Sequence, residues 1–218
     1  VQVAGCTHIA VRPARWLREG EQLIGTDDRS PETSMLMPPP GYKLESGLAT
    51  SYSLNPGFLL QAPLYLALRS GGREILQDPV LLLEAIERSS ESLVVFADRG
   101  QMHPPSENPS PLFGLLENLI VEVEAPGEGA FHPKLWLLRF ESQVDGESAM
   151  LRLAILSRNL TFDRSWDLSL VLDGKIGRRF VAENRELGEF INDLPRFATG
   201  SVEPNRKLLV RGLASDLR

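Results

Sequence analysis

The chain has 218 residues, with 23 Lys and Arg against 29 Asp and Glu, and a net charge of −6. This length suits one substantial domain, and the charge excludes a uniformly basic nucleic-acid coat while leaving a local basic channel open. The single cysteine, Cys6, excludes an internal disulfide and a Cys-rich zinc site. The sequence shows neither a signal-peptide pattern nor the roughly 20 apolar residues that a membrane span needs. We therefore expect a cytoplasmic protein without a membrane partner.

The predicted elements alternate between strands and helices from residue 43 onward. Apolar alternation, or a continuous apolar run, predicts strands at 44–53, 93–97, within 115–124, and at 131–140, 150–157 and 168–172. Asn or Asp followed by Pro, and an amphipathic spacing near the end, predict helices at 56–69, 78–89 and 178–194.

This order of elements indicates an α/β fold, in which a mixed β-sheet is flanked by helices. Residues 1–40 are polar and rich in turn residues, and we expect a lead-in segment there. Residues 41–195 would form the domain. Residues 196–218 are expected to be a linker or tail toward a further element.

Four polar residues follow the same two-residue spacing at two neighbouring predicted strands. His132 and Lys134 share one face, as do Ser157 and Asn159, so the four converge if the strands are adjacent. A histidine can act as a nucleophile or a proton carrier. A lysine and an amide can donate to phosphate oxygens and stabilise charge in a phosphoryl-transfer transition state, and the serine can support the group. Such a set needs no metal, and we expect no cofactor.

His-x-Lys followed one hairpin later by Ser-x-Asn-Leu-Thr resembles the HKD motif of the phospholipase D superfamily. The wider phrase FHPKLWLLRF…LRLAILSRNLTFDRSWDLSLVLDG is similar to the strand-turn-strand core of its bacterial phospholipase D-like and nuclease members. The resemblance is strongest over 119–173 and extends from about 43 to 194. It implies that residues 41–195 are one phospholipase D-like half, a catalytic domain with a single motif.

The sequence departs from the family pattern at two positions. The motif's Asp usually follows the His by about seven residues, where Arg139 stands here, and Leu156 replaces the small residue before the Ser. The tyrosyl-DNA phosphodiesterase branch also lacks that Asp and keeps His, Lys and Asn. An acid is often found downstream of the Asn. Asp167 is the first candidate for it and Asp163 the second, and it would orient a histidine of a partner motif.

The resemblance implies a phosphohistidine intermediate, in which one His attacks phosphorus and a second His, from another motif copy, protonates the leaving oxygen. Neither His8 nor His103 is followed two residues later by Lys. The site would therefore be completed by a homodimer or by the rest of a longer chain. His132 would be the nucleophile or its general-acid counterpart.

These features predict a metal-independent phosphodiesterase, a nuclease acting on nucleic acid in a bacterial cytoplasm. One alternative is a catalytically degenerate nucleic-acid-binding or scaffold subunit of a DNA-processing or phage-defence assembly. Another is a lipid phosphodiesterase, which is disfavoured because no membrane-binding amphipathic helix is evident.

Substrate contacts are expected from the loop after Asn159. Arg164, Arg158 and Trp166 are the candidates: Arg164 is the better of the two arginines, because Arg158 points to the other face, and Trp166 could stack on a base. Trp136 is expected in the core. The arginines around the motif could form a phosphate track or a solvated surface; they are Arg139, Arg152, Arg158, Arg164, Arg178 and Arg179.

Overall fold

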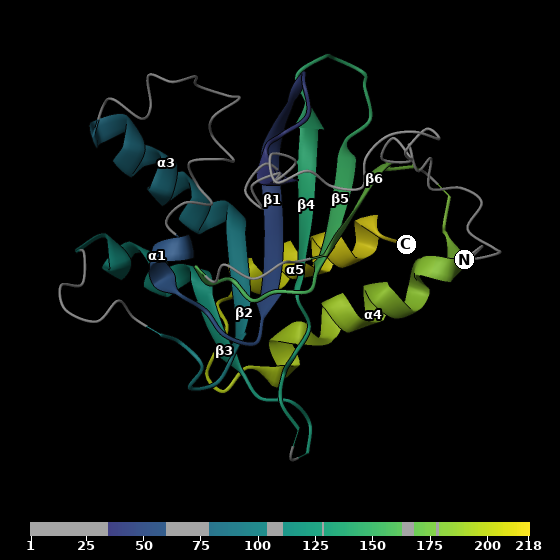
Figure 1. Cartoon of the computed structure of the whole chain (residues 1–218). Coiled ribbons are helices and arrows are strands. Elements are labelled where there is room, and N and C mark those ends of the chain that lie inside the picture. Colours follow the sequence, from purple (N-terminus) through teal and green to yellow (C-terminus); the bar gives the residue numbers. More distant parts are fainter. Residues whose placement is uncertain (1–34, 60–78, 104–110, 128, 163–167, 178) are drawn as a thin grey trace, which may run out of the picture.

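The computed structural model describes residues 35–59, 79–103, 111–127, 129–162, 168–177 and 179–218. Within these ranges a six-stranded sheet is flanked by helices, which confirms the expected α/β class (Figure 1). The strand order is β3-β2-β1-β4-β5-β6. Strands β1, β2 and β3 run parallel, and β4, β5 and β6 each run antiparallel to the preceding neighbour in the sheet. The strands are β1 Tyr42–Ser51, β2 Leu93–Asp98, β3 Ile120–Val123, β4 Leu135–Ser142, β5 Met150–Leu156 and β6 Ser169–Lys175.

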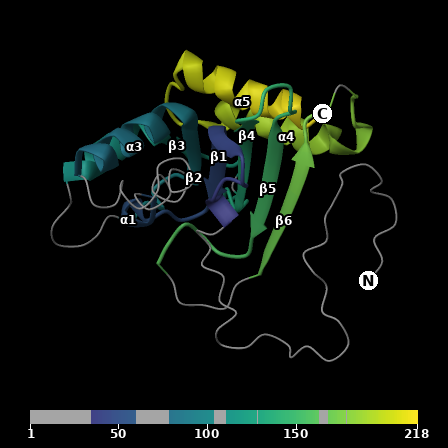
Figure 2. The same cartoon turned by 90° about the horizontal axis from the view of Figure 1, so that it is seen from above.

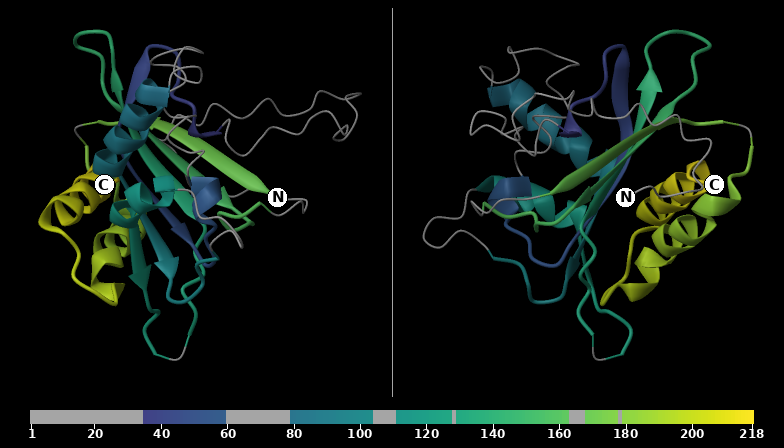
Figure 3. Two further views of the ribbon diagram at one scale, coloured as in Figure 1. Left: turned by 90° about the vertical axis from the view of Figure 1, so that its left-hand side faces the viewer. Right: turned by 45° about the vertical axis from the view of Figure 1, so that its right-hand side comes forward.

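Helical segments cover both faces of the sheet. One face carries α4 and α5, and the opposite face carries α1 and the 3-10 segment η2 (Figures 2 and 3). The helices are α1 Pro56–Leu59, α3 Pro79–Ser92, α4 Arg185–Asp193 and α5 Pro204–Asp216, with the 3-10 segments η2 Pro111–Leu119, η3 Ala182–Asn184 and η4 Leu194–Phe197.

Strand β4 divides its side chains between the two cores. Leu135 and Leu137 pack on the side of α4 and α5, whereas Trp136, Leu138 and Phe140 pack on the other side. Alternation along a strand produces this division, and burial of these apolar side chains is the main favourable term in folding. Trp136 is 1% exposed, which confirms its place in the core.

The expectation of a linker over 196–218 is wrong, because helix α5 forms there and packs against α4. Val210 and Leu213 of α5 are buried in the same core cluster as Leu137. Helices α4 and α5 approach closely at Gly188, where an added Cβ would lie 3.2 Å from the carbonyl oxygen of Ala214. The segment is therefore part of the packed fold.

Several element boundaries also differ from the predictions. The strand expected at 131–140 begins at Leu135, since Pro133 has no N–H to donate and disfavours a central strand. Strand β6 continues to Lys175, and the last long predicted helix begins at Arg185 after the turn η3. The helix expected at 56–69 is described as far as Leu59, and its remainder lies outside the described residues.

Candidate active site

The two segments of the motif lie at one edge of the sheet, the lower edge in Figure 1. Lys134 directly precedes β4 and Ser157 directly follows β5, and these strands are antiparallel neighbours. The start of one strand therefore lies beside the end of the other. The Leu156 N–H donates a hydrogen bond to the Lys134 carbonyl oxygen over 2.9 Å. The adjacency that the spacing indicated is thus present, although His132 and Lys134 lie before the strand and not within it.

His132 and Lys134 contact each other directly. The Lys134 ammonium nitrogen lies 2.9 Å from Nδ1 and 3.1 Å from Nε2 of the His132 ring, and it donates to the His132 carbonyl oxygen over 3.3 Å. An ammonium can only donate, so the ring nitrogen that accepts carries a lone pair and not a proton. Burial lowers the pKa of Lys134, because desolvation disfavours its charged form. A cation and an imidazole thus lie together at this edge.

The segment that carries His132 is held from both ends by side-chain oxygens. Asp98 Oδ1, at the end of β2, accepts from the Phe131 N–H over 2.9 Å. Thr50 Oγ1, near the end of β1, accepts from the Leu135 N–H over 3.1 Å. The four residues 131–134 form no strand, so these bonds fix where the chain enters β4. Sequence reasoning did not identify Asp98 or Thr50 as part of the site.

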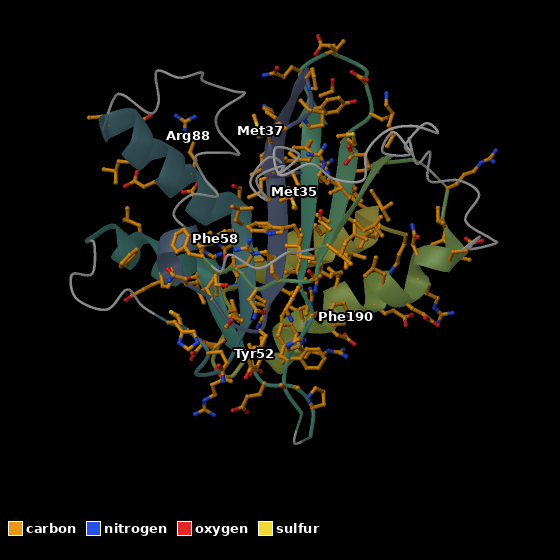
Figure 4. All side chains as sticks on the ribbon, in the orientation of Figure 1. Met35, Met37, Tyr52, Phe58, Arg88 and Phe190 are labelled. Carbon is orange, nitrogen blue, oxygen red and sulfur yellow. The ribbon has the colours of Figure 1, made fainter. Side chains whose placement is uncertain are left out.

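The segment that carries Asn159 is held by the end of β1 as well. Ser51 Oγ accepts from the Leu160 N–H over 3.0 Å, and the Asn55 N–H donates to the Leu160 carbonyl oxygen over 2.9 Å. Tyr52, which directly follows Ser51 in the chain, lies at the lower edge of the sheet, as Figure 4 shows. Its ring centroid is 5.1 Å from that of His132, with 42° between the ring planes. The end of β1 therefore contacts both segments of the motif.

Ser157 and Asn159 differ in what they bind. Ser157 Oγ accepts from the Leu168 N–H over 2.9 Å, and the Ser157 N–H donates to the Leu168 carbonyl oxygen over 3.0 Å. Ser157 therefore closes the loop that leads to β6. Asn159 Oδ1 is buried and has no hydrogen-bond partner among the described residues. A buried side-chain oxygen usually has a partner, so this oxygen can accept a hydrogen bond from a further donor.

Two arginines near the motif are engaged in contacts within the fold. Arg158 Nη2 donates to the Thr161 carbonyl oxygen over 2.6 Å and so stabilises the turn on which Arg158 itself lies. Arg152 Nε and Nη2 donate to the two carboxylate oxygens of Asp173 over 2.7 and 2.8 Å. Arg152 also donates to two backbone carbonyls, those of Met35 and Met37. Arg152 is thus committed to a structural ion pair and does not contribute to a phosphate track.

Other predicted members of the site lie outside the described residues. Residues 163–167 include the proposed orienting acid Asp167, its alternative Asp163, and the proposed substrate contacts Arg164 and Trp166. Arg178 also falls outside, and Arg179 is exposed. The roles of these residues stay predictions.

Arg139, which stands in place of the motif's Asp, is directed to another part of the fold. It lies about 13 Å along β4 from Leu135, at roughly 3.3 Å per residue. It forms ion pairs with three carboxylates, those of Glu45, Glu141 at 3.2 Å and Asp216 at 2.7 Å. It also lines a pocket of about 510 Å³ between β1, α3, β4 and α5, together with Arg88, which Figure 4 labels. Arg139 therefore links β1, β4 and α5 away from the lower edge.

In the described ranges, no group of three His, Cys, Asp or Glu side chains is arranged to hold a metal ion. None of the helices in the described part of the chain has the length and apolar character that a bilayer crossing requires.

Comparison with known proteins finds solved structures that share this fold. No protein-family model matches the sequence, and no curated protein matches it significantly. The structure of yeast tyrosyl-DNA phosphodiesterase superposes on 83% of this chain with a TM-score of 0.51, at 14% sequence identity, and the match covers 36% of that chain. The fold is phospholipase D-like.

Two variants of the same yeast enzyme give equivalent matches. One has a TM-score of 0.51 at 13% identity over 84% of this chain and 36% of that chain. The other has a TM-score of 0.50 at 13% identity over 85% of this chain and 37% of that chain. This chain thus spans just over a third of the length of these structures. The architecture expected from the motif resemblance is confirmed.

Proposed function

We propose that this chain supplies one half of the active site of a metal-independent phosphodiesterase, a nuclease that acts on nucleic-acid phosphodiesters in the cytoplasm. The observation that carries the proposal is the contact between the Lys134 ammonium and the His132 ring, beside the turn that bears Ser157 and Asn159. Phosphoryl transfer needs a nucleophile and fixed positive charge, and this pair offers both. The likeness to tyrosyl-DNA phosphodiesterase supports nucleic acid as the substrate class.

In the proposed reaction a ring nitrogen of His132 attacks phosphorus and forms an N–P bond while the P–O bond to the leaving group breaks. The leaving oxygen takes its proton from a second histidine, which belongs to a second copy of the motif. Water then attacks phosphorus, loses a proton to that second histidine, and releases the phosphate product with His132 regenerated. In the converse arrangement the second histidine attacks and His132 is the acid.

The other predicted site residues would act on the phosphoryl group, on a histidine or on the nucleotide chain. Lys134 and Asn159 would donate to the non-bridging oxygens, and Ser157 would support them from the same turn. Asp167 would orient a histidine and fix its tautomer, and Arg164 and Trp166 would contact the nucleotide chain. Each of these roles is part of the proposal.

A second motif is part of the proposal because the sequence has one His-x-Lys pair followed by Ser-x-Asn. Either a second copy of this chain or further sequence of a longer protein would supply it. The match to 36% of the tyrosyl-DNA phosphodiesterase chain supports the idea that a complete site needs more protein than this chain.

The proposal is tested by incubating the protein with labelled single- and double-stranded DNA in the presence of EDTA, over a range of protein concentrations. Cleavage should persist in EDTA and should be lost in His132→Ala and Lys134→Ala. The matched control is His103→Ala, which removes an exposed histidine outside the motif and should keep full activity. Phosphatidylcholine is the parallel substrate, and its cleavage in place of DNA would contradict the nucleic-acid assignment.

A nucleic-acid-binding module without turnover is the second candidate. It is favoured by Arg139, which stands where the motif has Asp and forms ion pairs within the fold. This candidate predicts that the wild-type chain binds DNA without cleaving it at any concentration. His132→Ala would then bind normally, whereas Lys134→Ala would bind more weakly.

A further inference from the structure

We propose that three consecutive residues, Thr50 and Ser51 at the end of β1 and Tyr52 directly after it, are positioning residues that set the geometry of both motif segments. Each of them contacts one of the two segments through its own side chain. The consequence for catalysis rests on the proposed function, whereas the placement of the segments can be measured without it.

Thr50 fixes the point where the His-x-Lys segment enters the sheet. Its side chain is 1% exposed, and its Oγ1 accepts the Leu135 N–H over 3.1 Å. Leu135 follows Lys134 directly, so this bond sets the direction in which the lysine leaves β4. A buried backbone N–H must find an acceptor, and the hydroxyl supplies one where the chain leaves the regular strand.

Ser51 fixes the backbone of the second motif segment, which carries Asn159. Its side chain is fully buried, and its Oγ accepts the Leu160 N–H over 3.0 Å while donating to the Ser53 carbonyl oxygen over 2.6 Å. Leu160 follows Asn159 directly. The bond therefore fixes the backbone beside the amide that would bind phosphate. Because successive side chains of a strand point to opposite faces, Thr50 and Ser51 reach different segments.

Tyr52 contacts the histidine itself. The separation of the two ring centroids, 5.1 Å, lies in the range of favourable aromatic pairs. His132 is exposed and Tyr52 is half-buried, so the tyrosine ring limits the orientations open to the imidazole on one side. Catalytic groups must be held within a fraction of an ångström by their neighbours, and a misplacement of about 1 Å can cost about 100-fold in rate.

The test compares variants that remove or keep the contacts of Thr50 and Tyr52. Thr50→Val removes the hydroxyl and keeps the branched shape, whereas Thr50→Ser keeps the hydroxyl. Tyr52→Leu removes the ring at a half-buried position, and Tyr52→Phe keeps it. Tyr42→Phe is the matched control, because it removes a side-chain hydrogen bond, that to Ser148, at the opposite end of the same strand.

Two quantities are measured: the affinity for inorganic phosphate, and the NMR resonances of the His132 ring and the Asn159 amide. Thr50→Val and Tyr52→Leu should weaken phosphate binding about tenfold and shift these resonances. Thr50→Ser, Tyr52→Phe and Tyr42→Phe should stay within about twofold of the wild type, even where Tyr42→Phe melts at a lower temperature. If Thr50→Val and Tyr52→Leu leave affinity and resonances unchanged, the inference is overturned.

If the wild-type protein binds no phosphate, the proposed function is contradicted. The positioning inference is then tested by the NMR resonances alone. In that case Thr50→Val must still shift the His132 and Asn159 signals while Tyr42→Phe does not. Equal spectra for these two variants would overturn the inference as well.

Discussion

The Leu156 N–H donates a hydrogen bond to the carbonyl oxygen of Lys134 over 2.9 Å, and this bond joins the two segments on which the proposed chemistry depends. Lys134 closes the His-x-Lys segment, and Leu156 immediately precedes Ser-x-Asn. The bond extends the β4–β5 ladder by one step beyond the Leu135–Ile155 pair. The register of a hairpin therefore determines which polar residues meet at the lower edge of the sheet.

Asn159 should bind phosphate through its amide N–H groups. Asn159→Asp keeps the shape but places a carboxylate near the anion, so it should weaken phosphate binding more than Asn159→Ala does. The loss of one hydrogen bond to a charged group, about 1.5–3 kcal/mol, corresponds to about 10- to 100-fold in affinity for Asn159→Ala. Isothermal titration measures both variants. Equal affinities for Asn159→Ala and the wild type would exclude Asn159 from the site.

The lowered pKa of Lys134 predicts an unusual pH dependence of anion binding. Binding needs the ammonium form, and desolvation brings its pKa below the ordinary value of 10.5. Affinity should therefore fall as pH rises, and the fall should begin at a lower pH than an exposed lysine would give. Sulfate is a suitable probe, because its own charge is constant in this range.

The control for this experiment is Lys134→Arg, which stays protonated throughout. Its affinity for sulfate should be flat where that of the wild type declines. A parallel decline in both proteins would show that some other group titrates.

Restoring the motif's Asp at position 139 should not improve activity. Arg139 is surrounded by the carboxylates of Glu45, Glu141 and Asp216. Arg139→Asp would therefore place a fourth negative charge among them and should destabilise the fold by about 1–3 kcal/mol, less than breaking a fully buried pair because these side chains are partly exposed. Denaturant unfolding measures the change, and Arg139→Lys is the charge-conserving control. An increase in activity without loss of stability would contradict this account.

The ion pair of Glu147 with Lys175 should make the stability of the folded chain depend on pH in acidic solution. The hydrogen bond from Lys175, followed by that from Ser142, lowers the pKa of Glu147 to about 2. A carboxylate with a depressed folded-state pKa stabilises the fold above its unfolded value, about 4.3, and this contribution is lost as pH falls toward about 2. Glu147→Gln should melt earlier at neutral pH and should show a shallower decline of melting temperature across that window. An unchanged decline would exclude Glu147 as a source of the acid sensitivity.

The strands were predictable from the sequence because their burial follows simple patterns. The run at 93–97 is buried throughout in β2, and β4 alternates between two cores. The spacing of His132 with Lys134 and of Ser157 with Asn159 also indicated that the two segments of the candidate site lie side by side at one edge, as they do in the structure. The step that failed was the extension of the strand back to 131, where Pro133 interrupts the backbone donors.

The apolar pattern of helix α5 is hard to recognise in the sequence, because a charged residue, Arg206, lies on the buried face of the helix. Arg206 is 6% exposed and its Nη1 donates to the Leu93 carbonyl oxygen over 2.7 Å, in line with the buried Val210 and Leu213. An arginine at such a position hides the apolar spacing on which helix prediction rests. Pro204 at the first helical position was the usable signal.

The contacts of Thr50 and Ser51 were not predictable from the sequence. Both residues are polar yet buried at the end of a strand, and their partners lie 85 and 109 residues away in the chain. A threonine is an ordinary strand residue, so its presence in β1 does not by itself indicate a role at the site. Such long-range side-chain contacts emerge from the sheet order, which brings β1 next to β4.

The most direct test of the account is calorimetric titration of the wild-type chain with inorganic phosphate in EDTA, beside Lys134→Ala and the control His103→Ala. We expect saturable binding of one phosphate by the wild type and by His103→Ala, and affinity at least about tenfold lower in Lys134→Ala. Absence of binding by the wild type, or equal affinity in Lys134→Ala, would contradict the claim that the lower edge of this sheet is a phosphate site.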